Sequence, residues 1–224
     1  MGGDIALAIE NASAGYQGRS VLHDVSVSIA TGECVAIMGR SGAGKSTLLG
    51  LLHEKASEQV ALVPQAAALV KTLSVFHNVY MGRLDRHSTA YNLRNLVWPC
   101  GDELSQVASA LTDVGLAEKL HAQAGALSGG QQQRVSVARA LYNGRPILIG
   151  DEPVSAIDGV QASDILRMLR GRFGTLVLAL HDIGLALEHC DRIIVLEGGR
   201  KIIDERASSL TARDLIGHFG GAPT

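Results

Sequence analysis

Apolar residues occur along this chain both as short continuous runs and in regular alternation, and both patterns predict β-strands. In the segment 21–29 the valines and the isoleucine fall on odd-numbered positions, opposite serines and an aspartate. This alternation predicts an antiparallel strand with one face in solvent. Continuous apolar runs predict buried strands over residues 34–38, 59–63, 146–150 and 175–180. A first strand is expected over 5–10, and a hairpin over 191–196 and 201–204.

Helices are predicted between these strands, where apolar residues recur at spacings of three and four. A helix begins near 72–79 with Thr72 or Ser74 as its N-cap, and residues 83–99 form short helices and loop. Because strands alternate with helices, we expect an α/β fold with a mainly parallel sheet and right-handed crossovers. The other predicted helices follow position 45 or cover 103–114, 131–142, 160–172, 183–190 and 210–219.

The block of residues 70–126 contains helical patterns and no clear strand. We interpret it as a helical lobe inserted into the α/β core, which then consists of 1–69 and 127–224. A chain of 224 residues suits one such domain, 1–224, and its low aromatic content of 4% predicts an aliphatic core.

Charge and cysteine content exclude several classes of protein. The net charge is −2 with no basic block, which argues against a nucleic-acid binder. The three cysteines have no C-x-x-C spacing, which favours a reducing compartment and argues against a metal site made of cysteines. With no signal pattern and no apolar run near ~18 residues, we expect a chain that is soluble by itself, so that any membrane role would have to come through a partner.

The segment 39–47 fits G-x-x-x-x-G-K-[ST], the loop that cradles phosphates. It lies between a buried strand and an apolar helical stripe, and its glycines let backbone N–H groups turn inward. Lys45 would reach the β- and γ-phosphates, and the Ser46 hydroxyl would bind Mg²⁺. The candidate nucleotide-binding residues are Gly39, Arg40, Ser41, Gly42, Ala43, Gly44, Lys45, Ser46 and Thr47.

Two carboxylates follow the apolar run 147–150. Asp151, at a strand end beside the phosphate loop, is placed to hold Mg²⁺. Glu152 is one residue further and would orient or deprotonate an attacking water. Acids often end strands for structural reasons, and this pair taken alone would favour that structural interpretation.

A second glycine-rich turn, Leu127, Ser128, Gly129, Gly130 and Gln131, opens the helix predicted over 131–142. Ser128 and the glycine N–H groups at a helix start would form an anion site. A single ATP cannot easily use two such helix starts of one subunit. The economical explanation is a head-to-tail dimer with each ATP between one phosphate loop and the partner's second turn.

These motifs, in this order, resemble the nucleotide-binding subunit of ABC transporters, and the resemblance covers nearly the whole chain. It implies an ABC ATPase fold, ATP and Mg²⁺, and a signature at 127–131. By the same resemblance Gln65 contacts Mg²⁺ and water, His181 contacts the γ-phosphate, and Asp158 of the D-loop links the two sites of the dimer. Tyr16 matches the adenine-stacking aromatic, although an ordinary loop tyrosine is the alternative.

One departure from the family lies between Lys45 and Gln65, where the segment is too short for the usual β-hairpin. We therefore expect a trimmed N-terminal antiparallel β lobe. Gly150 and Ile157 are milder variations. The segment 73–89 resembles phosphonate-importer ATPases in its N-V-x-x-G-R-L-x-x-x-S-T pattern; alternatively, it reflects the shape of the membrane subunit's coupling helix.

The resemblance implies an ATPase that powers import through a separate integral membrane permease, with a second copy of itself and a solute-binding protein as partners and no nucleic acid. It would lie peripherally on the cytoplasmic side of a bacterial inner membrane. An ABC-type subunit of a non-transport complex, such as a phosphonate-cleaving lyase assembly, is the alternative. A soluble ABC protein of translation or DNA repair fits less well, because that class usually has two cassettes or a long coiled-coil insertion.

Overall fold

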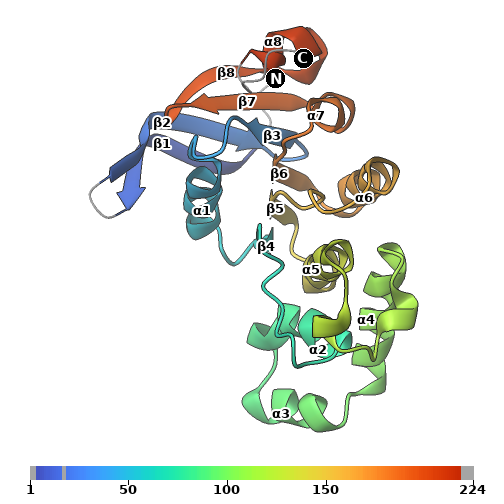
Figure 1. The fold of residues 1–224 in the computed structure, drawn as a ribbon. Coiled ribbons are helices and arrows are strands. Elements are labelled where there is room, and N and C mark those ends of the chain that lie inside the picture. The colour runs from blue at the N-terminus through green and yellow to red at the C-terminus, as the bar shows by residue number, and fades with distance from the viewer. Residues whose placement is uncertain (1–3, 17–18, 218–224) are drawn as a thin grey trace.

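The computed structural model describes residues 4–16 and 19–217, which form two sheets with helices packed around them (Figure 1). The larger sheet has the strand order β4-β5-β6-β3-β7-β8. All of its neighbouring strands are parallel except β7 and β8, which form the predicted antiparallel hairpin. The strands are β3 (Cys34–Met38), β4 (Val60–Val63), β5 (Ile147–Asp151), β6 (Thr175–Ala179), β7 (Arg192–Glu197) and β8 (Arg200–Arg206).

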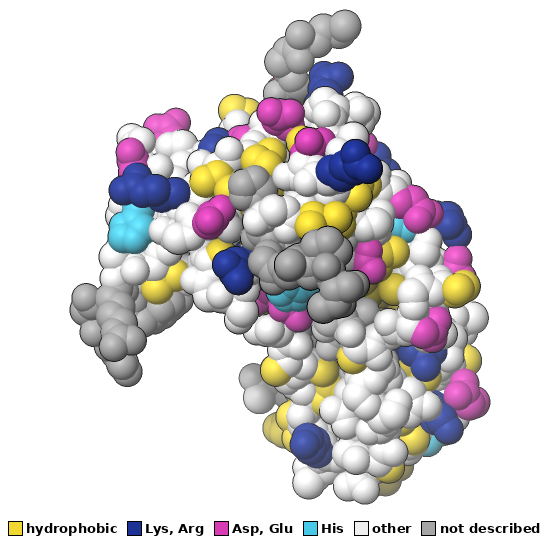
Figure 2. All heavy atoms as spheres, turned by 45° about the horizontal axis from the view of Figure 1, so that its top comes forward, with side chains coloured by type: hydrophobic (Ala, Val, Ile, Leu, Met, Phe, Trp, Pro, Cys, Tyr) yellow, Lys and Arg dark blue, Asp and Glu magenta, His cyan; other side chains and the backbone are white. Residues whose placement is uncertain are grey.

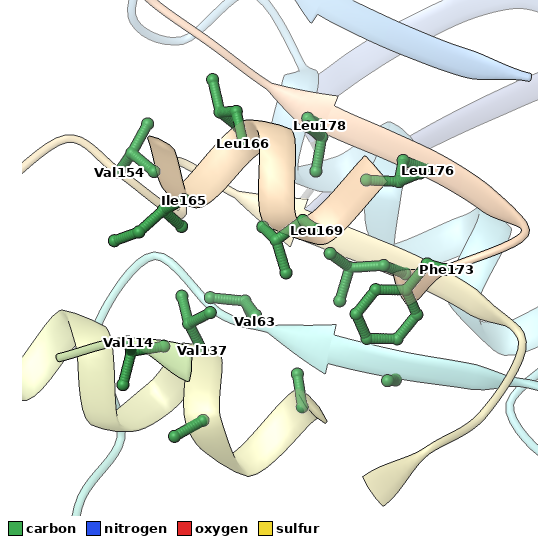
Figure 3. Close-up of a cluster of buried hydrophobic side chains, with 14 of the residues drawn as sticks. Val63, Val114, Val137, Val154, Ile165, Leu166, Leu169, Phe173, Leu176 and Leu178 are labelled. Carbon is green, nitrogen blue, oxygen red and sulfur yellow. The ribbon is translucent and has the colours of Figure 1, made fainter. Parts of the chain in front are cut away.

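Strand β3 lies inside the sheet and all five of its side chains are buried. Because successive side chains point to opposite faces, Val35 and Ile37 enter one core and Cys34 and Met38 the other. The first core lies under the smaller sheet and α1 (Lys45–Lys55). The second lies under α5 (Gly129–Asn143), α6 (Gly159–Arg172) and α7 (Ile183–His189), and Figure 3 shows its packing between α6 and β6.

The smaller sheet is the trimmed antiparallel lobe, which among the described residues consists of β1 (Ile5–Tyr16) and β2 (Arg19–Ala30). Strand β1 is longer than the predicted 5–10 because a bulge carries it past Asn11, whose φ is 48°. Strand β2 also has a bulge, at Asp24 with a φ of 52°, but the predicted range 21–29 already spanned that residue. Val25, Val27 and Ile29 are buried as expected. Beyond the bulge at Asp24 the facing changes, so that Leu22 is buried and Val21 only partly buried.

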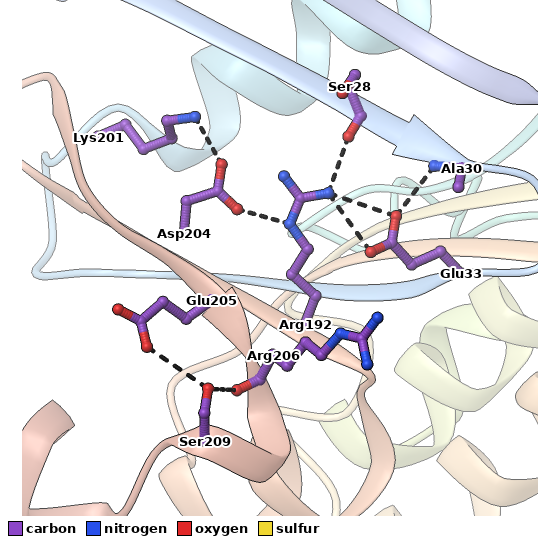
Figure 4. Close-up of polar contacts among 9 residues, drawn as sticks. All are labelled: Ser28, Ala30, Glu33, Arg192, Lys201, Asp204, Glu205, Arg206 and Ser209. Atoms are coloured by element: carbon purple, nitrogen blue, oxygen red, sulfur yellow. Dashed lines mark hydrogen bonds and ion pairs between the residues drawn. The ribbon is translucent and has the colours of Figure 1, made fainter. Parts of the chain in front are cut away.

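The two sheets are joined by an ion-pair network centred on Arg192 of β7 (Figure 4). Its guanidinium donates to Asp204 Oδ1 at 2.6 Å and to the Ser28 carbonyl of β2 at 3.0 Å. Glu33 accepts from Arg192 at 3.4 Å and from the Ala30 N–H at 3.0 Å. Hydrogen bonding to Asp204 raises the pKa of Arg192 and keeps it charged. The network therefore fixes β2 against the edge of the larger sheet.

The described residues 70–126 contain helices and a single isolated β-bridge, between Ser74 and Gln123. Ser74 caps the first helix by accepting from the His77 N–H. Helices of this segment pack on α5, below the sheets in Figure 1. Its elements are α2 (Val75–Tyr80), η1 (Met81–Arg86), α3 (Thr89–Val97), α4 (Gly101–Asp113), η2 (Ala117–Lys119) and η3 (Ala124–Ala126).

The chain continues past the hairpin into η4 (Ala207–Ser209) and α8 (Ala212–Ile216), so the predicted last helix is shorter than 210–219 within the described residues. Strand β4 is a sheet edge, which explains why Leu62 is 38% exposed in a run that predicted full burial. Arg145 covers part of that strand by donating to the carbonyls of Ser57 and Val60. None of the described helices has the length and apolarity needed to cross a membrane. On the face in Figure 2, described basic side chains lie among acidic ones.

Candidate functional site

The carboxyl ends of four strands place the predicted chemical groups at one edge of the larger sheet. The phosphate loop follows β3, Gln65 follows β4, Glu152 follows β5, and His181 follows β6. Because these strands are parallel neighbours in the order β4-β5-β6-β3, their ends converge. They surround a cavity of about 290 Å³ lined by Val21, Ser41, Gly42, Gly44, Lys45, Ser46, Thr47, Gln65, Glu152 and His181.

The phosphate loop requires glycine at its two ends. Gly39 has a φ of 141°, and a Cβ there would lie 2.2 Å from the Leu196 carbonyl oxygen. Gly44 has a φ of 102°, and its Cβ would lie 2.6 Å from Leu22 Cδ2. Gly44 is also the N-cap of α1 and supplies no side chain to cap it. The first N–H groups of α1 therefore remain open to an anion, with the helix dipole behind them.

Lys45 lies within this loop and is 6% exposed. Its Nζ donates to the carbonyls of Gly39 at 2.8 Å and Arg40 at 3.1 Å. Burial lowers the pKa of Lys45, while the charges of Glu152 and Asp151 act in the opposite direction. The ammonium is thus a concentrated positive charge in the wall of the cavity.

Asp151 ends β5, and its Oδ1 is buried without a hydrogen-bond partner in the described structure. A buried carboxylate oxygen of this kind is suited to an ordered water or a cation. The described residues contain no group of three or more His, Cys, Asp or Glu side chains arranged to hold a metal. The buried Asp151 oxygen is a donor that fits Mg²⁺, because this ion typically takes one or two protein oxygens and completes its coordination with waters and substrate phosphates.

Glu152 is the residue on which the site converges. Gln65 Nε2 donates to its Oε1 at 3.2 Å, and His181 Nε2 makes a short contact with the same oxygen. Its backbone has a φ of 56°, in the left-handed region that is unfavourable for residues other than glycine. Strain of this kind is frequent at functional sites and was not visible in the sequence.

The second glycine-rich turn lies outside this cavity, since Leu127, Ser128, Gly129, Gly130 and Gln131 are not among its lining residues. Ser128 is the N-cap of α5, and it forms a capping box with Gln131. A Cβ on Gly130 would lie 2.6 Å from the Ala156 carbonyl oxygen, so this glycine permits close packing. Asp158 caps α6 by accepting from the Gln161 N–H at 3.1 Å, and it also lies outside the cavity.

Tyr16 was expected in a loop, but it is the last residue of β1, because the strand continues through its bulge to this position. Its side chain lies outside the described part of the structure. Sequence reasoning missed Gln133 and Ser155, which both donate to the Glu152 carbonyl. The one available signal was a polar residue, Gln133, on the same helical face as the apolar Val137.

Comparison with known proteins agrees with this geometry. The family model described as ABC transporter matches residues 22–155. A phosphonates import ATP-binding protein of Caulobacter vibrioides is 34% identical over 98% of this chain and 95% of its own length. A relative of the same name from Anaeromyxobacter dehalogenans is 35% identical, but the chain spans only 47% of its length.

Solved structures of cassettes are also similar to this chain. A bacterial ABC transporter cassette described as dimeric superposes with a TM-score of 0.78 at 25% identity, covering 90% of this chain and 98% of the other. The cassette cbiO1 from Clostridium perfringens gives 0.74 at 26% identity, covering 95% and 93%. The chain therefore belongs to the ABC transporter family, and it is an ATPase of that family.

Proposed function

We propose that this chain is the ATP-hydrolysing subunit of an ABC importer that takes up a phosphonate or a related oxyanion through a separate permease. The observation that carries the proposal is the meeting of Glu152 with Gln65 and His181 at the cavity of the phosphate loop. The relatives named above support the importer assignment by their printed names. Those names give no support to the alternative, a non-transport complex.

In this proposal residues 39–47 bind the phosphates of ATP, and Tyr16 stacks on the adenine. The open start of α1 and the Lys45 ammonium neutralise the phosphate charge. Ser46, Asp151 and Gln65 are the residues that would hold Mg²⁺, and Asp151 has an unpartnered oxygen for that purpose. When bound, Mg²⁺ would draw negative charge away from the phosphates and orient them.

Glu152 is proposed as the general base for hydrolysis. Its carboxylate takes a proton from the attacking water as the water's oxygen forms a bond to the γ-phosphorus and the bond to the β–γ bridging oxygen breaks. His181 and Gln65 contact the same carboxylate oxygen and fix its direction. Freed phosphate and ADP then reopen the site.

The second turn is proposed to act on the ATP of a partner subunit. Residues 127–131 and Asp158 lie outside the chain's own phosphate-loop cavity, which is the arrangement a head-to-tail homodimer requires. A related cassette is described as dimeric, which agrees with this proposal. ATP binding would close such a dimer, and hydrolysis would open it.

We place the chain on the cytoplasmic side of a bacterial inner membrane as one domain, with core 1–69 and 127–224 and a helical lobe at about 70–126. The lobe and the segment after Gln65 would transmit closure to the permease. A solute-binding protein would deliver the cargo on the other side. No nucleic acid takes part in this function.

The segment 73–89 contributes to the architecture of the lobe. Asn78 is fully buried and binds the Val70 N–H at 2.7 Å. A Cβ on Gly82 would meet the Arg139 carbonyl oxygen at 2.7 Å, and Arg83 lies over the Tyr142 ring. Asp85 pairs with Arg145 at 2.6 Å, which ties the lobe to the core. Because these contacts explain the residue pattern of segment 73–89, that pattern does not indicate the substrate. The proposal of a phosphonate substrate rests on the relatives' names.

An uptake experiment tests the proposal. The host is a bacterial strain that lacks its own phosphonate-importer ATPase but keeps its own permease and binding protein. This strain receives the chain together with the permease that the chain serves. Growth on a phosphonate as sole phosphorus source is expected with the parental chain and not with Lys45→Ala. Equal growth with the parental chain and with Lys45→Ala would contradict the import function. So would ATP hydrolysis by the parental chain without any uptake of the phosphonate.

A further inference from the structure

The main chain of Glu152 is held by a side chain from another element. Gln133 of α5 donates from Nε2 to the Glu152 carbonyl at 3.0 Å. This glutamine is 4% exposed, so its amide is shielded from water. Ser155 adds its N–H at 3.3 Å and its hydroxyl at 3.2 Å to the same carbonyl. The Glu152 N–H donates to the Ala179 carbonyl of β6 at 3.2 Å.

These contacts matter because Glu152 adopts a backbone conformation that is costly for its residue type. Such a conformation persists only where the surroundings fix it. Here β6 fixes the N–H, and Gln133 with Ser155 fixes the carbonyl. Once both are fixed, the side chain points toward Gln65 and His181.

Helix α5 is well placed to impose this constraint. Its start at Ser128 packs along the chain that follows Glu152, since Gly130 approaches the Ala156 carbonyl too closely for any side chain. Gln133 lies about one turn further along the same helix. One rigid element therefore connects the second glycine-rich turn to the backbone of Glu152 in the same subunit.

We propose that Gln133 is a positioning residue for ATP hydrolysis, fixing through the Glu152 carbonyl the direction of the Glu152 carboxylate. This inference rests on the proposed role of Glu152 as general base. Gln133 does not line the nucleotide cavity, so it acts through Glu152 and not on the substrate. An error of about 1 Å in the placement of a reacting group costs on the order of 10²-fold in rate.

The first test replaces the amide with an apolar side chain of similar length, Gln133→Met. The expected result is a fall of about 10- to 100-fold in kcat, while the Kd for ATP stays within about twofold because the phosphate loop is untouched. Since hydrolysis slows and binding persists, an ATP-bound dimer should accumulate in size-exclusion chromatography. Gln133→Leu, which is also apolar and has no donor, should reproduce the loss if Gln133→Met does not fold.

The matched control is Gln132→Met. Gln132 is the preceding residue, and its amide donates to the carbonyls of Leu127 and Ala124, away from Glu152. This variant should keep kcat within about threefold of the parental value. A similar kcat loss in both variants would show that any amide on this helix has the same effect, and would overturn the proposal.

A double-mutant comparison separates positioning from general support of the fold. If Gln133 acts through Glu152, Gln133→Met should cost nothing further in a Glu152→Gln background, because coupled residues are not additive. The same fold loss in both backgrounds would overturn the inference. A parental hydrolysis rate in Glu152→Gln alone would instead overturn the proposed function.

Discussion

Helices α1 and α5 each begin at a glycine-containing loop, and the two helices differ in how their first N–H groups are hydrogen-bonded. Helix α1 follows Gly44, which supplies no side-chain cap. Helix α5 follows Ser128, which caps the helix by accepting from the Gln131 N–H at 3.3 Å, while Gln131 accepts from the Ser128 N–H at 3.0 Å. The start of α1 thus has no side-chain cap, whereas at the start of α5 the Ser128 side chain already binds one of the first N–H groups, that of Gln131.

This difference indicates how the two turns would share the work of binding ATP. The first turn, with Lys45 beside it, has unsatisfied donors and gains fully from a phosphate. At the second turn the Gln131 N–H would exchange its hydrogen bond to Ser128 for one to the partner's nucleotide, so the net gain from that group is small. A small net gain suits an interface that closes and reopens in every cycle.

The largest effect is expected at the open turn. Lys45→Ala removes the main point charge facing the γ-phosphate and should abolish ATP binding or turnover. Nucleotide titration and phosphate release measure the two steps. Lys55→Ala, at the exposed far end of the same helix, should behave like the parent. Unaltered affinity together with normal turnover in Lys45→Ala would contradict the assignment.

The next largest effect separates ATP binding at the phosphate loop from ATP hydrolysis. Glu152→Gln keeps the shape and loses the basic oxygen, so hydrolysis should fall by roughly 10²–10⁴-fold while ATP still binds. A stable ATP-bound dimer should then appear by size-exclusion chromatography. Asp151→Asn should weaken Mg²⁺ binding and fail to accumulate that dimer, and Glu188→Gln, on the surface of α7, is the neutral control. If Glu152→Gln hydrolysed ATP at the parental rate, the catalytic role would have to be assigned to His181.

The capped turn is tested by Ser128→Arg. Because Ser128 lies outside the chain's own cavity, the variant should bind nucleotide as a monomer with parental affinity but fail to close the dimer. Hydrolysis should fall by at least about 10-fold, which corresponds to about 1.4 kcal/mol of activation free energy. Mixed dimers of a Lys45 variant and a Ser128 variant should retain one intact composite site. If they retain none, the head-to-tail arrangement is wrong.

The smallest effect concerns the cap itself. Ser128→Ala removes the side-chain acceptor at the start of α5 and should lower the free energy of unfolding by about 1 kcal/mol. Urea denaturation measures it. Ser109→Ala, exposed within α4, should change that free energy by less than about 0.5 kcal/mol. Equal changes would mean that the capping box contributes nothing to stability.

Most of the fold followed from local patterns in the sequence. The run 34–38 matches β3 residue for residue, because a strand buried on both faces needs only continuous apolar residues. Asp151 at the end of β5 and His181 just after β6 lie at the same edge of the sheet because the two strands are parallel neighbours. The length of β1 was underestimated, since the bulge at Asn11 breaks the alternation that marks a strand.

The precise geometry of the site depends on contacts between distant residues, and these have no local signature. The left-handed backbone of Glu152 is held by Gln133 and by Ala179, residues 19 and 27 positions away. The capping box at Ser128 was only partly foreseen, as a helix start that binds an anion. Its internal hydrogen bonds depend on the rotamer of Gln131, which a single sequence does not specify.

The exposed edge of the larger sheet has a consequence for how the protein avoids self-association. A free strand edge is a template for pairing with another chain, above all while a parallel sheet is still assembling. Strand β4 is only four residues long, and the Arg145 guanidinium occupies the carbonyls of Ser57 and Val60 at its start. A short edge strand whose carbonyls already bind the Arg145 guanidinium offers an incoming strand few free acceptors. Arg145 therefore disfavours edge-to-edge aggregation of this sheet.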